Sequence, residues 1–528
     1  MSKRFYITTA IDYVNGQPHL GHAYEKIIAD VIARVRRSLG EEVFFLTGLD
    51  EHGQKVQLAA IAEGKNPQVY CDEFATCWKN FAQALGLTND DFVRTTEPRH
   101  KEVVQAILTK LNDEGHFYKK AYKGFYSLGA ETFLTEKDRL PDGSFDASWG
   151  KVVELEEENY YFKLQAHQQW LIDYIEANPH FVQPGYRRNE VLGFLKNNVL
   201  EDLCISRPAS RLNWGIPIPF DQNYVTYVWF DALVNYISIP AANGDEAVQS
   251  AISHQTAENS ELKTKNSQLS LWPADIHIIG KDILKFHTVY WPIMLKAMGL
   301  PLPKQVLVHG WWQKDGQKMS KSTGISVDPI SVIQEWGLDA FRFYVLRELA
   351  IGPDGNWTDA GFQSRYQAEL GNGLGNLVNR SLSMLKRYRA GKIPARHDEL
   401  APDAERAMQE TIANFRNNEL QEALQSIWSL VNRANLYVEQ TAPFKLAKDP
   451  AQSSRLDEVL YNLCESCRVL AVLLNPFLPE TSAKIYTQLG LKNSPHQFSD
   501  AAWGKLEAGN EIGEPVALFP RKDIPKPA

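Results

Sequence analysis

One stretch near the N-terminus constrains the fold more than any other: FYITTAIDYVNGQPHLGH, from Phe5 to His22. Its β-branched and aromatic residues predict a strand that ends in a turn and leads into a helix. His19 and His22 then lie on one face of the first helical turn, beside the first backbone N–H groups and the positive end of the helix dipole. Phosphate binds well at such a helix start, and Gly21 would let a nucleotide approach the backbone. The alternative is a surface helix with two solvated histidines.

A second motif, KMSKS, runs from Lys318 to Ser322 in the second half of the chain. Two lysines and two serines in a loop suit a polyphosphate, and a solvated basic loop is the alternative for this motif alone. HLGH and KMSKS in one chain, separated by a long α/β body, resemble the two signature motifs of class I aminoacyl-tRNA synthetases. Leu20 stands where the commonest form of the first motif has isoleucine.

Composition indicates a soluble globular protein of several domains. The chain has 528 residues, of which 44% are hydrophobic and 23% charged, and it has no apolar run near the roughly 20 residues that a membrane span needs. The net charge of −8 argues against a nonspecific coat for nucleic acid and allows a local basic surface. Five cysteines suggest free thiols. Because strand-like sequence begins almost at once, we expect no leader segment and a cytoplasmic location.

The order of elements predicts an α/β protein with a doubly wound, Rossmann-type parallel sheet, followed by a C-terminal all-α helix bundle. By resemblance to class I synthetases, the bundle is expected to bind the anticodon. We expect five divisions: 1–115, the first half of the catalytic domain with HLGH; 116–225, an inserted α+β connective domain; 226–315, the second half of the catalytic domain; 316–365, the KMSKS loop and a region that contacts the tRNA stem; and 366–528, the bundle and a C-terminal tail.

Five stretches together resemble methionyl-tRNA synthetases across almost the whole chain: AIDYVNGQPHLGH, TGLDEHG, YVWFDALVNYI, HIIGKDILKFHTVYWP and KMSKS. The resemblance implies that Asp50 holds the methionine ammonium group, with Arg207 a candidate to support it. It also implies a side-chain pocket, for which thioether contacts with aromatic rings contribute about 0.3–1.5 kcal/mol each. Periodicity alone would assign the same aromatic residues to helix cores. The expected pocket consists of Ile11, Tyr13, Trp229, Ala232, Leu233, Tyr236, Ile283, Phe286, His287 and Trp291.

The resemblance further implies two reactions at one site. The methionine carboxylate attacks the α-phosphorus of ATP, which arrives as its Mg²⁺ complex, and the terminal adenosine hydroxyl of tRNA then takes the methionyl group. The catalytic groups are expected to be His19, His22, Lys318 and Lys321. The full set expected at ATP is His19, Gly21, His22, Glu25, Gly280, Asp282, His309, Lys318, Ser320 and Lys321.

Related synthetases often carry zinc knuckles in the insertion, and this chain departs from that pattern. Ser127 and Ala130 occupy the first CxxC spacing, and no cysteine lies between Cys77 and Cys204. Since four nitrogen or sulfur ligands cannot be assembled there, we expect a knuckle-shaped insertion without metal.

By resemblance, Asn376 and Arg380 read the CAU anticodon. Phe444 takes a position that is usually tryptophan, where an aromatic ring can still stack on a base. The expected partners are L-methionine, ATP and the initiator and elongator forms of tRNA(Met), with no membrane. Because the chain ends near the bundle, we expect no dimerising tRNA-binding appendage and a monomer.

Two other functions stay open at this point. One is a catalytically silent, synthetase-like binding protein, against which the intact HLGH and KMSKS motifs argue. The other is an enzyme that forms methionyl-adenylate for an acceptor other than tRNA, for which the change at Phe444 is relevant.

Overall fold

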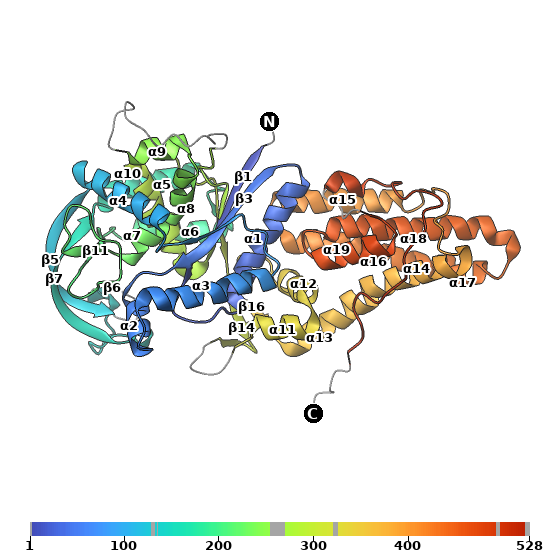
Figure 1. Ribbon diagram of the computed structural model, residues 1–528, viewed down its shortest axis with the longest axis horizontal. Coiled ribbons are helices and arrows are strands. Elements are labelled where there is room, and N and C mark those ends of the chain that lie inside the picture. The colour runs from blue at the N-terminus through green and yellow to red at the C-terminus, as the bar shows by residue number, and fades with distance from the viewer. Residues whose placement is uncertain are drawn as a thin grey trace.

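The computed structural model describes residues 3–127, 132–134, 136–253, 270–319, 326–492 and 497–522. The molecule is elongated, with a parallel sheet and its insertion at one end and a helix bundle at the other (Figure 1). The two parts meet along α1 (Leu20–Ser38) and α12 (Leu338–Glu348). In the part of the chain that the structure describes, no helix is both long and apolar enough to cross a membrane.

A seven-stranded sheet of described residues forms the centre of the N-terminal part, and each of its pairings is parallel. β1 pairs with β3 on one side and with β12 on the other, and β12 is followed by β13 and β8. The apolar run of β1 suits a strand that is covered on both faces. The predicted doubly wound sheet is therefore confirmed. Its strands are β1 (Arg4–Thr9), β2 (Asp12–Tyr13), β3 (Glu42–Asp50), β4 (Asp91–Arg94), β8 (Val182–Gln183), β12 (Ile276–Gly280) and β13 (Val306–His309).

The first helix, α1 (Leu20–Ser38), follows β1 as the sequence predicts. Its buried Ile27, Ile28 and Val31 pack in the core beneath the sheet. The helix stops before Gly40, whose φ of +82° lies in the left-handed region that glycine adopts without strain. The helices α2 (Gln54–Ala62), α3 (Pro67–Ala84) and α4 (Pro98–Asp113) come next along the chain.

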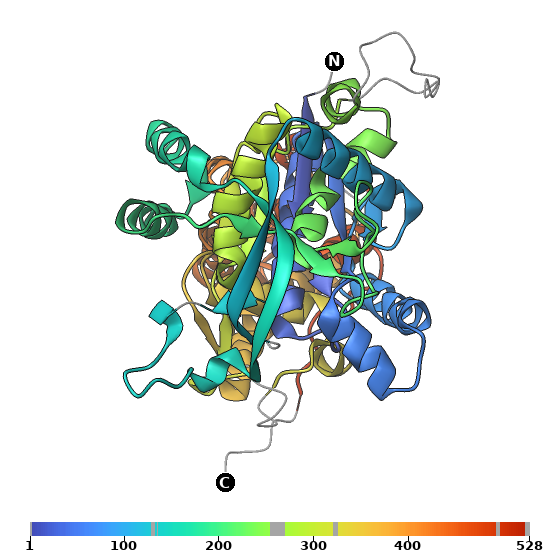
Figure 2. The ribbon, with the colours of Figure 1, turned by 90° about the vertical axis from the view of Figure 1, so that its left-hand side faces the viewer.

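A long antiparallel ribbon dominates the predicted insertion, and Figure 2 shows it running across the end of the molecule. It consists of β5 (Phe117–Ser127) and β7 (Val152–Phe162), with β6 (Thr132–Leu134) and β9 (Leu203–Cys204) at its sides. The helices α5 (Gln168–Ala177) and α6 (Gly185–Asn197) follow, and between them β8 pairs with Val306 and Leu307 of β13. The chain thus returns to the parallel sheet inside the range 116–225 that was predicted as an insertion.

After the ribbon and its helices, the chain forms a small two-stranded antiparallel sheet, β10 (Ser206–Pro208) and β11 (Tyr224–Thr226). Three short helices follow: α7 (Val228–Leu233), α8 (Asn235–Ala242) and α9 (Glu246–Ile252). Residues 254–269, the main part of a polar stretch that spans 243–270, lie outside the described residues. After β12, a π-helical turn, Phe286–Tyr290, leads into α10 (Trp291–Met298).

A three-stranded sheet precedes the bundle and contains β14 (Trp312–Lys314), β15 (Gln317–Lys318) and β16 (Gly355–Trp357). The KMSKS motif starts at the end of β15. Its residues Ser320 and Lys321 lie outside the described residues, and the structure describes no side chain for Lys318. The helices of this region are α11 (Pro329–Trp336), α12 (Leu338–Glu348) and α13 (Asp359–Arg365).

Buried polar contacts of α12 join the two parts of the molecule. Arg342 is fully buried, pairs with Asp30 of α1 at 2.8 Å, and donates to the carbonyl oxygens of Pro476 and Phe477 in the bundle. Asp339 accepts a hydrogen bond from the backbone N–H of Thr481. Both α1 and the bundle are therefore tied to α12 by buried polar contacts.

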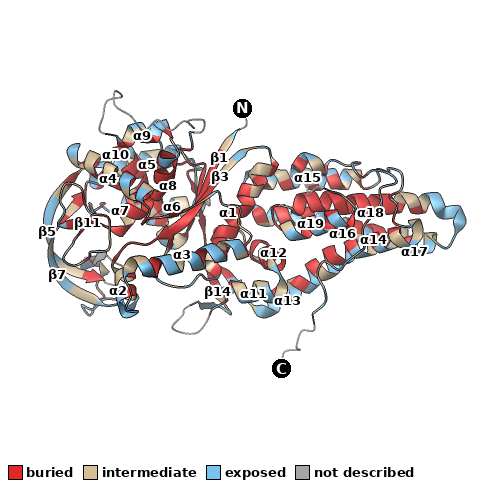
Figure 3. Ribbon diagram, in the orientation of Figure 1, coloured by how far each residue is buried: buried red, intermediate tan, exposed pale blue. Residues whose placement is uncertain are grey.

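The predicted C-terminal bundle is confirmed. It contains α14 (Asn376–Arg389), α15 (Ala401–Arg416), α16 (Leu420–Thr441), α17 (Pro443–Leu446), α18 (Ser453–Leu474) and α19 (Pro479–Gln488). Figure 3 shows α18 at its centre, buried along most of its length. Cys464 and Cys467 are free thiols inside this helix, where burial raises their pKa values. They are core residues.

Candidate active site

A cavity of about 2770 Å³ opens beyond the carboxyl ends of β1, β3, β12 and β13. Ligands of doubly wound sheets bind at this edge, where the strand order reverses. The cavity brings together most of the residues that the sequence assigned to the two substrates. These are Ile11, Tyr13, His19, Gly21, His22, Glu25, Asp50, Trp229, Ala232, Leu233, Tyr236, Gly280, Asp282, Ile283, Phe286, His287 and His309.

The HLGH motif forms the start of α1. His19 is the N-cap residue, its Nδ1 atom accepts from the backbone N–H of Gly21 at 3.1 Å, and Nδ1 of His22 accepts from the backbone N–H of His19 at 3.2 Å. In a neutral imidazole whose Nδ1 accepts, Nε2 carries the proton. The two rings stack with centroids 3.7 Å apart. A Cβ atom at Gly21 would lie 3.0 Å from the His19 ring, so glycine permits this packing.

The predicted adenosine side is formed by residues after β12 and β13 and by Glu25 of α1. His309 Nε2 lies 3.2 Å from Glu25 Oε2, and His309 Nδ1 bonds the Gly310 carbonyl at 2.8 Å. A Cβ atom at Gly280 would lie 2.5 Å from Asp282 Oδ1, so a larger residue would displace that carboxylate. These residues make a polar wall beside the helix start.

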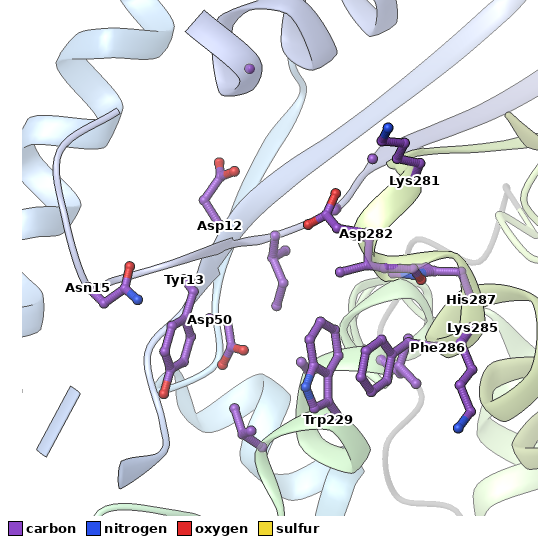
Figure 4. Close-up of a pocket in the computed structure, with 18 of the residues that line it drawn as sticks. Asp12, Tyr13, Asn15, Asp50, Trp229, Lys281, Asp282, Lys285, Phe286 and His287 are labelled. Carbon is purple, nitrogen blue, oxygen red and sulfur yellow. The ribbon is translucent and has the colours of Figure 1, made fainter. Parts of the chain in front are cut away.

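The predicted methionine side is aromatic. Trp229 of α7 and Phe286 stack with centroids 3.7 Å apart and an interplanar angle of 11°. In Figure 4, Tyr13 and Asp50 lie on the other side of the pocket from this ring pair. Phe286 and His287 project from the π-helical turn, a feature that often marks functional sites. An amino acid could thus place its ammonium group toward Asp50 and its side chain against the rings.

The hydrogen bonds of Tyr236 and His287 make the floor of this pocket electrically neutral. His287 Nδ1 donates to the Ile283 carbonyl at 3.0 Å, so in the neutral ring Nε2 accepts from the Tyr236 hydroxyl at 2.7 Å. Burial lowers the pKa of His287 to about 4 and raises that of Tyr236 well above its ordinary value. Both side chains are therefore uncharged near neutral pH.

Of the two remaining predicted residues, one lies outside the cavity and the other lines it. Trp291 is fully buried behind Tyr236, its indole N–H donates to His277 Nε2 at 3.3 Å, and it does not line the cavity. The alternative that helix periodicity gave for Trp291 was packing in a core, and Trp291 does lie in a core. Arg207 lines the cavity, lies 4.5 Å over the Tyr227 ring and donates to the Ser206 carbonyl. Its support of Asp50 stays a prediction.

A buried histidine and aspartate cluster escaped the sequence reasoning. Both oxygens of Asp231 are bonded, one to His52 Nδ1 at 2.6 Å and the other to His100 Nε2 at 2.7 Å. Burial alone would raise the pKa of Asp231, but the two histidines lower it to about 2. The cluster ties the segment after Asp50 to α7, which carries Trp229. Three polar residues in separate helices and loops gave no sequence signal of this contact.

The predicted anticodon residues occupy the bundle. Asn376 is exposed and Arg380 half-buried, four residues apart on α14, and Arg380 pairs with Glu439 at 2.9 Å. Phe444 lies in α17, toward the end of the bundle remote from the sheet (Figure 1). Its side chain is 43% exposed, so the ring is accessible from solvent.

No group of three or more His, Cys, Asp or Glu side chains that could hold a metal occurs among the described residues. Residues 128–131, which include Ala130 of the predicted knuckle, lie outside them. Ser127 donates to the Trp149 carbonyl within the ribbon region. The absence of zinc from the insertion stays a prediction.

Comparisons with known proteins agree with this geometry. The family model described as "tRNA synthetases class I (M)" matches residues 5–143 and 146–382. The model described as "Anticodon binding domain of methionyl tRNA ligase" matches residues 389–523. The fold, the cavity and these matches define a class I aminoacyl-tRNA synthetase.

Individual relatives indicate which kind of class I aminoacyl-tRNA synthetase the chain resembles. The methionine–tRNA ligase of Bacillus subtilis is 42% identical over 98% of this chain and 78% of its own length. That of Rickettsia felis is 40% identical over 99% of both chains. The solved structure of Mycobacterium tuberculosis methionyl-tRNA synthetase bound by methionyl-adenylate is 35% identical, with a TM-score of 0.89 over 98% of this chain and 100% of that one. The chain belongs to the methionyl-tRNA synthetase family.

Proposed function

We propose that the protein is a methionine–tRNA ligase that attaches L-methionine to tRNA(Met) through a methionyl-adenylate intermediate. The observation that carries this conclusion is that one cavity combines a helix start with two histidines and an aromatic pocket beside Asp50. Family membership over the whole chain supports it. Neither reaction requires a covalent nucleophile from the protein, because positioning and fixed charge supply the catalysis.

In the first step, the methionine carboxylate attacks the α-phosphorus of ATP and pyrophosphate leaves. His19 and His22 present Nε2–H donors at the positive end of α1, where negative charge is stabilised. Lys318 and Lys321 of the KMSKS motif hold the departing pyrophosphate. Ser320, Gly280, Asp282, Glu25 and His309 complete the nucleotide site, and Mg²⁺ enters bound to ATP.

For methionine, Asp50 pairs with the ammonium group and the Trp229–Phe286 stack forms one wall for the thioether. A neutral Tyr236–His287 pair suits this ligand. A charge at this position would be buried against the apolar thioether, which could not stabilise it by hydrogen bonding. Ile11, Tyr13, Ala232, Leu233 and Ile283 complete the pocket. Trp291 supports it from behind Tyr236.

The cavity has room for the end of a tRNA as well. Its volume of about 2770 Å³ exceeds the roughly 300–1,000 Å³ of small-molecule pockets, and its lining extends to the inserted ribbon at Tyr118 and Tyr161. At the other end of the molecule, Asn376, Arg380 and Phe444 read the anticodon, with the exposed Phe444 ring stacking on a base.

Several finer statements belong to the same proposal. The protein serves both initiator and elongator tRNA(Met), acts in the cytoplasm as a monomer, and divides functionally at 115, 225, 315 and 365. The connective region 116–225 works without zinc. Each rests on the sequence pattern and on resemblance to the family.

ATP–pyrophosphate exchange with each of the twenty amino acids, followed by tRNA charging on the same preparation, tests the proposal. We expect exchange with methionine alone and charging of tRNA(Met). Absence of both reactions would contradict it and favour a catalytically silent binding protein.

Exchange without charging would instead favour an enzyme that passes the adenylate to another acceptor. The observation that keeps this second candidate is phenylalanine rather than tryptophan at position 444, which reduces the stacking area. A Phe444→Trp variant distinguishes the two. If the protein is a ligase, we expect the variant to charge tRNA(Met) better than wild type. If the protein uses another acceptor, we expect no change in charging.

A further inference from the structure

Lys26 is a buried cation on α1 to which neither the motifs nor the resemblance gave a role. Its side chain is 4% exposed. The ammonium group donates to the Ala10 carbonyl at 2.9 Å, to Glu25 Oε1 at 2.8 Å and to Asp12 Oδ1 at 3.1 Å. A lysine ammonium has three donors, and all three are used here. Burial alone would lower the pKa of Lys26, but the two carboxylates raise it above its ordinary value.

Both carboxylates that Lys26 binds line the active-site cavity, whereas Lys26 itself lies behind them. Each carboxylate also faces a histidine of the nucleotide side. Glu25 Oε2 lies 3.2 Å from His309 Nε2, and Asp12 Oδ1 lies 3.8 Å from His22 Nε2. Lys26 thus lies between two pairs that each consist of a carboxylate and a histidine. One pair includes His309 of β13, and the other includes His22 of the HLGH motif.

Two carboxylates at a triphosphate site need compensation. Like charges a few ångströms apart repel far more strongly where protein replaces water, because the effective dielectric constant is lower. Asp12 is 7% and Glu25 6% exposed, so solvent screens them poorly. An anionic substrate entering the cavity would meet this repulsion unless a cation balances it.

We propose that Lys26 is a positioning residue for ATP, whose ammonium group compensates Asp12 and Glu25 so that these carboxylates can order the nucleotide side without repelling the triphosphate. This inference rests on the proposed adenylation reaction. Lys26 does not touch the substrate. It acts through the two side chains that it binds and through the Ala10 carbonyl, which fixes the chain after β1.

The titration of Asp12 supplies a readout. Burial raises the pKa of Asp12 to about 7, and Lys26 opposes the rise. On the methionine side, Tyr236 and His287 are the titratable groups that feel Glu25, and both are neutral. Without Lys26, ionisation of Asp12 at alkaline pH would add a negative charge that no ammonium group of α1 balances. Protonation of Asp12 at acid pH would remove that charge.

The test measures the KM for ATP in methionine-dependent pyrophosphate exchange between about pH 6 and about pH 9. We divide the KM for ATP of Lys26→Met by that of wild type at each pH. We expect this ratio to increase about tenfold from the acid to the alkaline end of the range, with little change in the KM for methionine. Adding Asp12→Asn should abolish the rise. Lys26→Gln keeps N–H donors without the charge, and it gives the same readout if Lys26→Met does not fold.

Arg34→Met is the matched control, since Arg34 lies on the same helix and bonds Asp30 and the Gly86 carbonyl. Its loss should leave the KM for ATP unchanged at every pH. A KM for ATP in the Lys26 variants that equals the wild-type value throughout would overturn the inference. So would a rise that is equal at every pH and is not relieved by Asp12→Asn, which would indicate a structural role. Failure of the proposed function itself is distinguishable, because wild-type protein would then show no exchange.

Discussion

The two halves of the proposed active site, one for the nucleotide and one for methionine, are built by opposite means. The nucleotide half combines a helix start, two stacked histidines and the buried ions Asp12, Glu25 and Lys26. The methionine half relies on the Trp229–Phe286 ring stack and on side chains that burial keeps neutral.

This difference follows from what each ligand presents. A triphosphate is recognised by fixed donors and compensated charge, which are strong where water is excluded. A thioether offers little to hydrogen bonding, so shape and contacts between sulfur and rings must select it. Substitutions that act on one substrate and spare the other therefore test the comparison.

The largest effect is expected for Lys321→Ala in the KMSKS motif. Loss of a cation that stabilises developing charge lowers reaction rates by about 10²–10³-fold. We expect such a fall in the adenylation rate measured by pyrophosphate exchange, with the KM for methionine nearly unchanged. Lys304→Ala is the control, because Lys304 pairs with Asp275 away from the cavity. An unchanged adenylation rate in Lys321→Ala would refute the assigned role.

Trp229→Ala tests the methionine half. Removing an aromatic ring that contacts a ligand costs about 2 kcal/mol of binding, or about thirtyfold in affinity. We expect the KM for methionine to rise by this amount while the KM for ATP stays close to wild type, both measured by exchange kinetics. Trp170→Ala, which removes a tryptophan of α5 outside the cavity, serves as control. An equal rise in both KM values would mean that the ring stack supports the whole site.

Arg380→Ala leaves both halves intact and tests the bundle. Losing one RNA contact costs about 1–3 kcal/mol, so charging of tRNA(Met) should fall about tenfold while methionine-dependent exchange continues at its normal rate. Arg406, which pairs with Asp403 on α15, provides the control substitution. Equal loss of charging and exchange would show that Arg380 acts on the fold rather than on tRNA.

The smallest effect concerns pH. The pKa of His287 is about 4 in the fold, below its ordinary value near 6.5, so its contribution to stability is present above about pH 6.5 and is lost as the pH falls through about 4. We expect the KM for methionine to stay flat down to about pH 5 and then to rise about threefold, as a proton on Nε2 displaces the Tyr236 hydroxyl. His287→Gln should flatten this profile. A rise centred near pH 6.5 in wild type would contradict the buried, neutral histidine.

Much of this site could be predicted from sequence because its main parts are local. A strand, turn and helix start place His19 and His22 by chain geometry alone, and strand ends place Asp50 and His309 at one edge of the sheet. The same reasoning predicted the doubly wound sheet and the bundle, and the structure confirmed both.

The remainder depends on contacts between distant segments. The cluster of His52, His100 and Asp231 joins three elements that no sequence period connects. Lys26 reads as an ordinary residue of an amphipathic helix until the fold brings Asp12 beside it. β8 is only two residues long, too short a run to predict as a strand of the main sheet.

One measurement tests the division of the site most directly: exchange kinetics of Lys26→Met, Trp229→Ala and the double variant at alkaline pH, with the KM for each substrate determined separately. We expect the double variant to show the raised KM for ATP of Lys26→Met and the raised KM for methionine of Trp229→Ala, each within about twofold. If either single substitution raised both KM values equally, or if the two effects in the double variant were far from additive, the two halves would not be separate.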